Sequence, residues 1–143
     1  MKWGESKIEF VRPIHWILML YGNQTIKASI MHVTSDNLTW GHRFQSSGPL
    51  KIRSVNTYLD ELEKNGYVIA DFNKRRNLIR TGVEKAAKSV GGRIKNGEKL
   101  YDEVASLVEW PTPLIGNFDK NFLQLPEEVI ISTLTEHQRY FPL

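Results

Sequence analysis

"DFNKRRNLIRTGVEKAAKSVGG", residues 71–92, predicts the longest helix of the chain and much of its fold. Four apolar residues recur at the spacing of one helix face: Ile79, Val83, Ala86 and Val90. Asp71 is a favoured residue for capping a helix N-terminus, and Gly91-Gly92 is typical of a helix end. We therefore expect one amphipathic helix between these two signals, with its apolar stripe facing the core.

The positive charge of the chain is concentrated around this helix. Residues 74–99 carry nine basic and two acidic residues, whereas residues 100–143 carry two basic and seven acidic ones. Arginine suits phosphate oxygens, and neutralised phosphates release counterions, so the basic block is a candidate RNA-binding surface. The candidate residues are Lys74, Arg75, Arg76, Arg80, Lys88 and Arg93. Four of them are expected to project outward, opposite the apolar stripe: Lys74, Arg76, Arg80 and Lys88. An ordinary solvated helix face has the same composition, and both interpretations stay open.

Length and composition limit the class of protein. A chain of 143 residues with 41% hydrophobic and 24% charged residues fits a single globular domain. The absence of cysteine excludes disulfides and thiolate metal sites, and it fits a reducing cytoplasm. The longest apolar run, residues 14–21, is too short to cross a bilayer, and no signal segment precedes it. We expect a cytoplasmic protein without membrane contact.

The remaining elements indicate an α+β domain built on a mixed sheet. Residues 13–33 predict an N-terminal β-hairpin whose first strand, residues 14–21, is apolar on both faces and therefore covered on both. Two further short strands are predicted, at residues 67–70 and 113–118. Three more helices, which bring the number to about four, are predicted at residues 54–66, at 98–109 and from residue 126 onward. The helix at 98–109 is expected to bury Leu100, Val104, Leu107 and Val108.

Motifs for catalysis or nucleotide binding are missing. No glycine-rich phosphate loop, H-E-x-x-H motif or G-x-S-x-G elbow occurs. The four histidines are His15, His32, His42 and His137, and no two of them have helical metal-ligand spacing. His42 lies in a predicted loop, where functional residues concentrate, but the neighbouring Trp40 and Phe44 favour a loop pinned to the core by aromatic rings.

Four separated motifs carry a family resemblance. They are RPIHWILMLYG (residues 12–22), GHRF (41–44), EVASLVEWPTPLIGNFDKNFLQLP (103–126) and HQRYFP (137–142). Together they resemble the beta subunits of bacterial heterotetrameric glycyl-tRNA synthetases, over essentially the whole chain. The resemblance implies a piece from the N-terminal portion of a longer subunit, with a fold similar to the B3/B4-type module of phenylalanyl-tRNA synthetase beta chains.

The resemblance also implies a role in the ATP- and Mg²⁺-dependent attachment of glycine to tRNA. In this family the alpha subunit activates glycine with ATP, while the beta subunit binds and positions tRNA and completes the heterotetramer. The implied partners are the alpha subunit, tRNA(Gly) and the rest of the beta subunit. No catalytic, cofactor-binding or metal-binding residue is expected in this chain. Six residues are carried over as signature positions of unknown role: His42, Arg43, Phe44, His137, Gln138 and Tyr140.

Two rival functions stay open. One is hydrolytic editing, which requires a deep pocket of converging polar groups near His42, Arg43 and Glu109. The other is a purely structural spacer, in which the basic residues contact no RNA.

Overall fold

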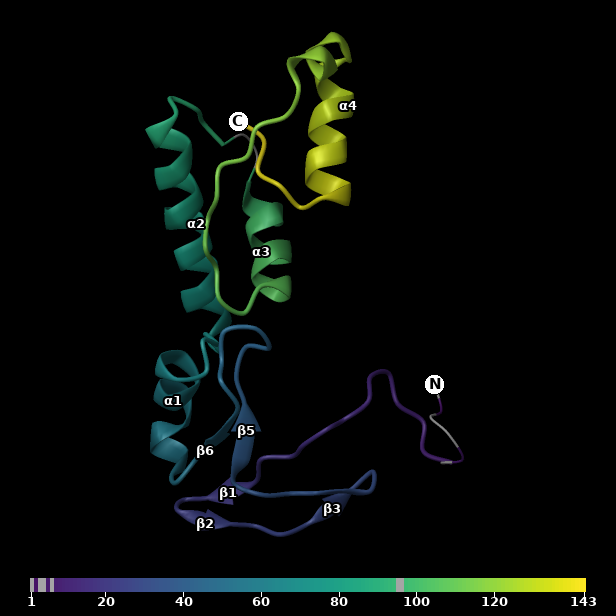
Figure 1. The fold of residues 1–143 in the computed structure, drawn as a ribbon, viewed down its shortest axis with the longest axis vertical. Helices are drawn as coiled ribbons and strands as arrows, with labels where there is room; N and C mark the ends of the chain where they lie inside the picture. Colours follow the sequence, from purple (N-terminus) through teal and green to yellow (C-terminus); the bar gives the residue numbers. More distant parts are fainter. Residues whose placement is uncertain (1, 3–4, 6, 95–96) are drawn as a thin grey trace. The chain divides into compact units, whose positions relative to one another are not determined.

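The computed structural model describes residues 2, 5, 7–94 and 97–143. Short strands occupy the first part of the chain and helices the second, so the predicted α+β class is confirmed (Figure 1). The chain divides into two compact units, Met1–Val68 and Ile69–Leu143, each with its own set of contacts. One module spanning residues 1–143 stays a prediction, and so does the likeness to a B3/B4-type module.

The strands of the first unit form three separate antiparallel pairs instead of one mixed sheet. The pairs are β1 (Leu20–Tyr21) with β2 (Gln24–Thr25), β3 (Ser29–Ile30) with β4 (Val33–Thr34), and β5 (Leu38–Trp40) with β6 (Pro49–Lys51). The predicted hairpin is therefore present around Gly22-Asn23 but is much shorter than residues 13–33.

A buried serine explains why the hairpin stops. The Ser35 hydroxyl accepts a hydrogen bond from the Ala28 amide at 2.8 Å and donates to the Ile26 carbonyl at 2.7 Å. Ser35 is 0% exposed. The Ala28 amide and the Ile26 carbonyl therefore bond to this buried side chain, whereas in a longer hairpin they would bond to the backbone of a neighbouring strand. Met31 and His32, with φ values of 51° and 65°, form the two-residue turn that joins β3 to β4.

The prediction of a strand covered on both faces is wrong for residues 14–21. Only Leu20 and Tyr21 are in a strand, while Trp16 is 42% and Tyr21 79% exposed. A sheet of two strands has no further strand or layer to cover its second face. The Trp16 ring instead packs against Trp40, with ring centroids 4.8 Å apart.

The helix predicted at residues 54–66 is present as α1 (Tyr58–Lys64), while its first part is a 3₁₀ turn, Val55–Thr57. The Ser54 side chain caps this turn by accepting from the Asn56 amide at 3.3 Å. After α1, residues 67–70 form no strand, because Tyr67 has a φ of 53° and leaves the extended conformation. The predicted strand there is wrong, although Ile69 is buried as expected.

Backbone of the β5–β6 loop touches backbone at the end of α1. The His42 amide donates to the Gly66 carbonyl at 2.6 Å. A Cβ at Gly41 would overlap the Gly66 carbonyl oxygen and Cα and would lie 2.7 Å from its carbonyl carbon. Glycine at position 41 is therefore required by close backbone approach.

The second unit is organised by α2 (Phe72–Ser89) and α3 (Glu98–Leu107), which lie side by side in Figure 1. The Asp71 carboxylate accepts from the Lys74 amide at 2.8 Å, and Gly91 takes a φ of 74° where α2 ends, so both predicted helix signals are confirmed. Ile79, Tyr101 and Ala105 form the buried cluster, and four half-buried residues pack on it: Val83, Ile94, Val104 and Phe141.

The predicted apolar faces of α2 and α3 are right at most positions and wrong at their ends. Leu107 is 68% and Val90 53% exposed. Tyr101 and Ala105, one turn apart on α3, face α2 in place of Leu107. Small Ala105 permits close helix contact, and the Tyr101 ring fills the space beside it.

Residues 113–118 are not the predicted strand, since they run without a ladder partner among the described residues. Pro113 packs instead against Gly82, where a Cβ would lie 2.6 Å from the proline Cγ. The 3₁₀ turn Lys120–Gln124, helix α4 (Glu127–Ser132) and a π-helical turn, Thr133–His137, complete the unit. The helix predicted from residue 126 is confirmed, with Pro126 as its N-cap.

We expect Gly41→Ala to lower the free energy of unfolding by about 1–3 kcal/mol, the usual cost of overpacking. The added Cβ has no space against the Gly66 backbone. Gly116→Ala is the matched control, because a Cβ there meets nothing within 4 Å. Urea denaturation of both variants measures the difference, and equal stability would contradict the close backbone contact.

Candidate nucleic-acid interface

Arg75 points inward and holds α2 to the end of α3. Its Nε donates to the Ala105 carbonyl at 2.8 Å, and its Nη1 donates to the carbonyls of Ile69 and, at 3.3 Å, Ala70. The Ala105 carbonyl belongs to the last turn of α3, where carbonyls have no partner within the helix. Arg75 therefore caps a helix of its own unit and is not available to a phosphate.

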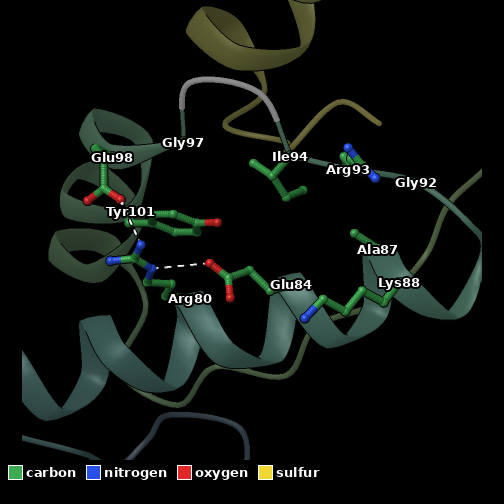
Figure 2. Close-up of a pocket in the computed structure, with 10 residues that line it drawn as sticks. All are labelled: Arg80, Glu84, Ala87, Lys88, Gly92, Arg93, Ile94, Gly97, Glu98 and Tyr101. Carbon is green, nitrogen blue, oxygen red and sulfur yellow. Dashed lines mark hydrogen bonds and ion pairs between the residues drawn. The ribbon is translucent and has the colours of Figure 1, made fainter.

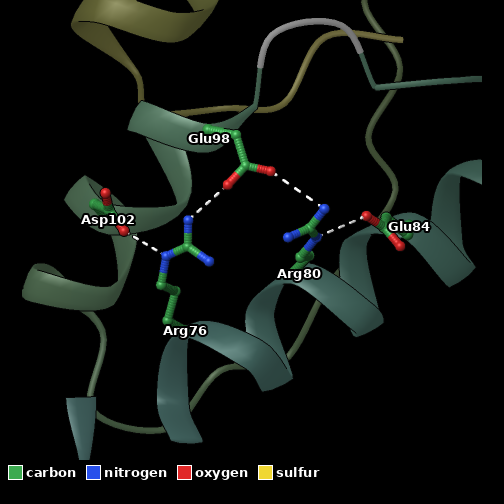
Figure 3. Close-up of polar contacts among 5 residues, drawn as sticks. All are labelled: Arg76, Arg80, Glu84, Glu98 and Asp102. Atoms are coloured by element: carbon green, nitrogen blue, oxygen red, sulfur yellow. Dashed lines mark hydrogen bonds and ion pairs between the residues drawn. The ribbon is translucent and has the colours of Figure 1, made fainter. Parts of the chain in front are cut away.

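Arg76 and Arg80 are paired with acidic residues across α2 and α3 (Figure 3). Arg76 Nη2 lies 2.7 Å from Glu98 Oε2, and Arg76 Nε bonds to the Asp102 carboxylate. Arg80 bonds to the other oxygen of Glu98 at 3.2 Å and to Glu84 Oε1 at 3.1 Å. One carboxylate, that of Glu98, thus joins two arginines one helical turn apart.

The expectation of outward projection is wrong for Arg76, whereas Arg80 is exposed as expected but is bonded to two carboxylates. The Arg76 side chain is only 20% exposed, and hydrogen bonds from its guanidinium to Asp102 and Glu98 raise the pKa of that group. The pairing arises because Arg76 and Arg80 share one spacing on α2, and Glu98 and Asp102 share the same spacing on α3. These two arginines connect helices, so their charge is largely neutralised within the unit.

Lys88 and Arg93 remain exposed at the C-terminal end of α2, and they line a cavity of about 550 Å³ (Figure 2). Within the described residues neither forms an ion pair. The full lining is Arg80, Glu84, Ala87, Lys88, Gly92, Arg93, Ile94, Gly97, Glu98 and Tyr101. Because Arg80 is bonded to Glu84 and Glu98, the unneutralised charge of the cavity comes from Lys88 and Arg93.

Other features of this cavity limit its chemistry. Burial raises the pKa of the Tyr101 phenol, with a further contribution from Glu84, so the phenol keeps its proton at neutral pH. Lys88 lies in the last turn of α2, where a cation also balances the negative end of the helix dipole. Both cations line the same cavity, so each would attract an anion that entered it.

Lys74 lies apart from this cavity. It is exposed in the first turn of α2, and fourteen residues separate it from Lys88, about 21 Å along a helix axis. The six predicted RNA-binding residues are thus not one surface: Arg75, Arg76 and Arg80 make internal contacts, Lys88 and Arg93 share a cavity, and Lys74 stands at the other end of the helix.

The signature GHRF lies on the loop between β5 and β6. The Phe44 amide donates to His42 Nδ1 at 3.3 Å, and the Arg43 guanidinium carbon lies 5.8 Å from the Phe44 ring centroid. Phe44 is 86% exposed. Pinning of this loop by aromatic rings is therefore wrong for Phe44, although Trp40 does pack, on Trp16.

The signature HQRYFP joins the C-terminal segment to α3. Arg139 Nε lies 3.1 Å from Glu103, and the Phe141 ring stacks on Tyr101 with centroids 4.9 Å apart. His137, Gln138 and Tyr140 are exposed. The contacts of Arg139 and Phe141 with α3 were not predicted, because their partners lie 36 and 40 positions away and leave no local signal.

The described residues contain neither a metal-binding cluster nor a membrane-spanning helix. No group of three or more His, Asp or Glu side chains there is arranged to hold a metal ion. In the same part of the chain, no helix combines the length and the apolar character that crossing a bilayer requires.

Comparison with known proteins finds related sequences along the whole chain. A family profile described as glycyl-tRNA synthetase beta subunit matches residues 1–143. The glycine–tRNA ligase beta subunit of Hahella chejuensis is 47% identical over 141 residues, which cover 99% of this chain and 20% of that protein. Those of Moorella thermoacetica and Neisseria meningitidis serogroup A are 42% and 38% identical over 143 residues, which cover 100% of this chain and 20% and 21% of the relatives. The chain spans about one fifth of the length of these proteins.

We expect Arg75→Met to lower the free energy of unfolding by about 1–3 kcal/mol, the usual cost of a buried acceptor left without a donor. The control is Lys85→Met at an exposed position of the same helix, which should stay within about 0.5 kcal/mol of the parent. Urea denaturation compares the two variants. Similar losses in both would contradict the capping role of Arg75.

We also expect stability to fall at alkaline pH in a way that Tyr101→Phe reduces. The folded-state pKa of Tyr101 is above its value of 10.0 in the unfolded chain, so above that pH only the unfolded state releases the proton. The free energy of unfolding therefore decreases as pH rises through this range. Denaturation at about pH 8 and about pH 10.5 tests this, with the exposed Tyr140→Phe as control. Equal alkaline losses in the two variants would contradict it.

Proposed function

The chain belongs to the family of glycyl-tRNA synthetase beta subunits, and we therefore propose that it is a non-catalytic region of a glycine–tRNA ligase that binds and positions tRNA. The observation that carries the proposal is the exposed pair Lys88 and Arg93, which have no ion pair within the described residues and line one cavity. Both cations of the pair are unneutralised and line the same cavity, whereas Arg76 and Arg80 are bonded to carboxylates.

Phosphate contact by such a pair is physically favourable. Each backbone phosphate neutralised by a lysine or arginine releases counterions, and this release supplies most of the sequence-independent affinity for RNA. Arginine adds a planar fork that can bond two phosphate oxygens at once. Contacts of this kind fix the position of an RNA without reading its bases.

In this proposal the chemistry takes place elsewhere in the enzyme. ATP, Mg²⁺ and glycine bind the alpha subunit, which joins glycine to tRNA(Gly) in the cytoplasm. This chain, the rest of the beta subunit and the alpha subunit together form the heterotetramer that holds the tRNA. The cavity of Lys88 and Arg93 supports that division, because its other titratable lining consists of paired charges and a protonated phenol.

The two rival functions receive less support. Neither of the two cavities described in the second unit, that of Lys88 or a smaller one lined by Glu103, Ser106, Leu107 and Arg139, contains His42, Arg43 or Glu109. Editing therefore has no support from these cavities at the residues where it was expected. A purely structural spacer explains Arg75, Arg76 and Arg80 but does not explain why Lys88 and Arg93 lack an acidic partner among the described residues.

We expect the double variant Lys88→Glu, Arg93→Glu to weaken binding of tRNA(Gly) to the full heterotetramer about tenfold or more at moderate salt. The slope of log K against log salt concentration should fall by about two, one for each phosphate that is no longer neutralised. Filter binding at several salt concentrations measures both quantities. Reversal of Arg75, Arg76 and Arg80 is unsuitable, because it would break contacts inside the unit.

The matched control is Lys64→Glu, Lys120→Glu, which changes the net charge equally at exposed lysines outside the basic block. It should leave the salt slope close to that of the parent enzyme. An unchanged slope in the Lys88 and Arg93 variant, or equal losses of affinity in the two double variants, would overturn the proposed phosphate contacts.

A further inference from the structure

The most exposed aromatic side chain of the described residues belongs to Phe44. It is 86% exposed on the loop that joins β5 to β6 (Figure 1), and its nearest aromatic neighbour, His42, lies 6.2 Å away between ring centroids. Single exposed apolar side chains are common on protein surfaces, but the Phe44 ring would be more stable in contact with another surface. The ring is therefore available for contact with another molecule.

The loop that carries Phe44 is held firmly. The His42 amide donates to the Gly66 carbonyl at 2.6 Å, and the Ser46 amide donates to the His42 carbonyl at 2.9 Å. The Phe44 amide donates to His42 Nδ1 at 3.3 Å. Gly41 is pressed against the backbone of Gly66 at the base of the loop. The backbone that carries Phe44 is thus fixed before binding, which lowers the entropic cost of binding.

One cation lies beside the ring. The Arg43 guanidinium carbon lies 5.8 Å from the Phe44 ring centroid. Residues 37–59, which include the whole β5–β6 hairpin, contain Arg43, Lys51 and Arg53 and no acidic residue. All three basic side chains are exposed. An apolar protein surface that covered Phe44 would have to desolvate Arg43 beside it, which is costly.

An exposed aromatic ring with adjacent cations is the combination that binds single-stranded nucleic acid. Unpaired bases stack on aromatic side chains and on guanidinium planes, while nearby cations attract the phosphate backbone. Stacking of this kind accepts any base, because every base has a π-face. It requires a base that is not held in a duplex, as in the loops and the single-stranded end of a tRNA.

We propose that Phe44, together with Arg43, is a stacking site for an unpaired base of tRNA. The inference rests on the proposed tRNA-binding function, and it assigns a role to the signature GHRF in the first unit, separate from the phosphate contacts of Lys88 and Arg93 in the second. Gly41 and His42 set the loop conformation, Phe44 supplies the stacking face, and Arg43 supplies the charge.

The test compares Phe44→Trp, Phe44→Leu and Phe44→Ala in the full heterotetramer, with unmodified tRNA(Gly) transcript as the probe. The leucine and alanine variants should weaken tRNA binding about 5- to 100-fold, the range for loss of one stacked base. The tryptophan variant should bind as well as the parent or better, because it keeps an aromatic face. The slope of log K against log salt concentration should stay unchanged in all three, since no phosphate contact is removed.

Leu59→Ala is the control, since Leu59 is an exposed apolar residue of the same unit, 58% exposed on α1. It should leave tRNA affinity unchanged. Thermal unfolding and the mass of the heterotetramer are measured for every variant. Loss of assembly or of thermal stability in Phe44→Ala that Phe44→Leu restores, with unchanged tRNA affinity of the assembled enzyme, would show that Phe44 packs on protein and would overturn the proposal.

The outcomes also separate this inference from the proposed function. If the Lys88 and Arg93 variant weakens tRNA binding and Phe44→Leu does not, the stacking site is wrong and the tRNA-binding function stands. If neither variant changes the affinity, both are wrong. If Phe44→Leu and Phe44→Ala alone weaken binding, the stacking site is right and the phosphate contacts must lie elsewhere on the chain.

Discussion

The contact between α2 and α3 is the constraint on which the second unit depends. Its apolar part is small, with Ile79, Tyr101 and Ala105 almost fully covered. Its polar part has two components. Arg75 of α2 donates to a carbonyl in the last turn of α3, and the Glu98 carboxylate of α3 bonds to two arginines of α2. Exposed ion pairs contribute little singly, but a shared carboxylate with fixed arginine forks specifies which turns of the two helices meet. The arginines that suggested an RNA-binding surface therefore bond within the unit and align its two helices.

The helix caps could be predicted from the sequence, whereas the length and pairing of the strands could not. Ser54, Asp71 and Gly91 act within three or four residues of themselves, so their capping roles follow from residue type and spacing. The length of a strand depends on which segments and side chains bond to its backbone. The hydroxyl of Ser35 ends the first hairpin by bonding across seven and nine residues, and Pro113 lies on Gly82 instead of in a ladder. Neither contact can be predicted from the alternation of apolar residues along the sequence.

The candidate site could be predicted only in part for a related reason. Composition indicated the basic block as a candidate, but helical periodicity treats all outward positions alike. Whether an arginine is available depends on the neighbouring helix, where Glu98 and Asp102 stand one turn apart opposite Arg76 and Arg80. That complementary spacing was present in the sequence and could have been used. Phe44 shows the converse, since an aromatic residue in a short motif was assigned to the core and lies in solvent.

The neutralisation of Arg76 and Arg80 has a consequence for how the second unit meets a polyanion. Residues 69–143 carry eleven basic and ten acidic side chains, so the unit has almost no net charge, while the cations Lys88 and Arg93 stand together at one end of α2. Its field is that of a dipole and fades with distance faster than that of a net charge. In the proposed function, such a unit would attract a distant RNA only weakly, and its two cations would act mainly at short range.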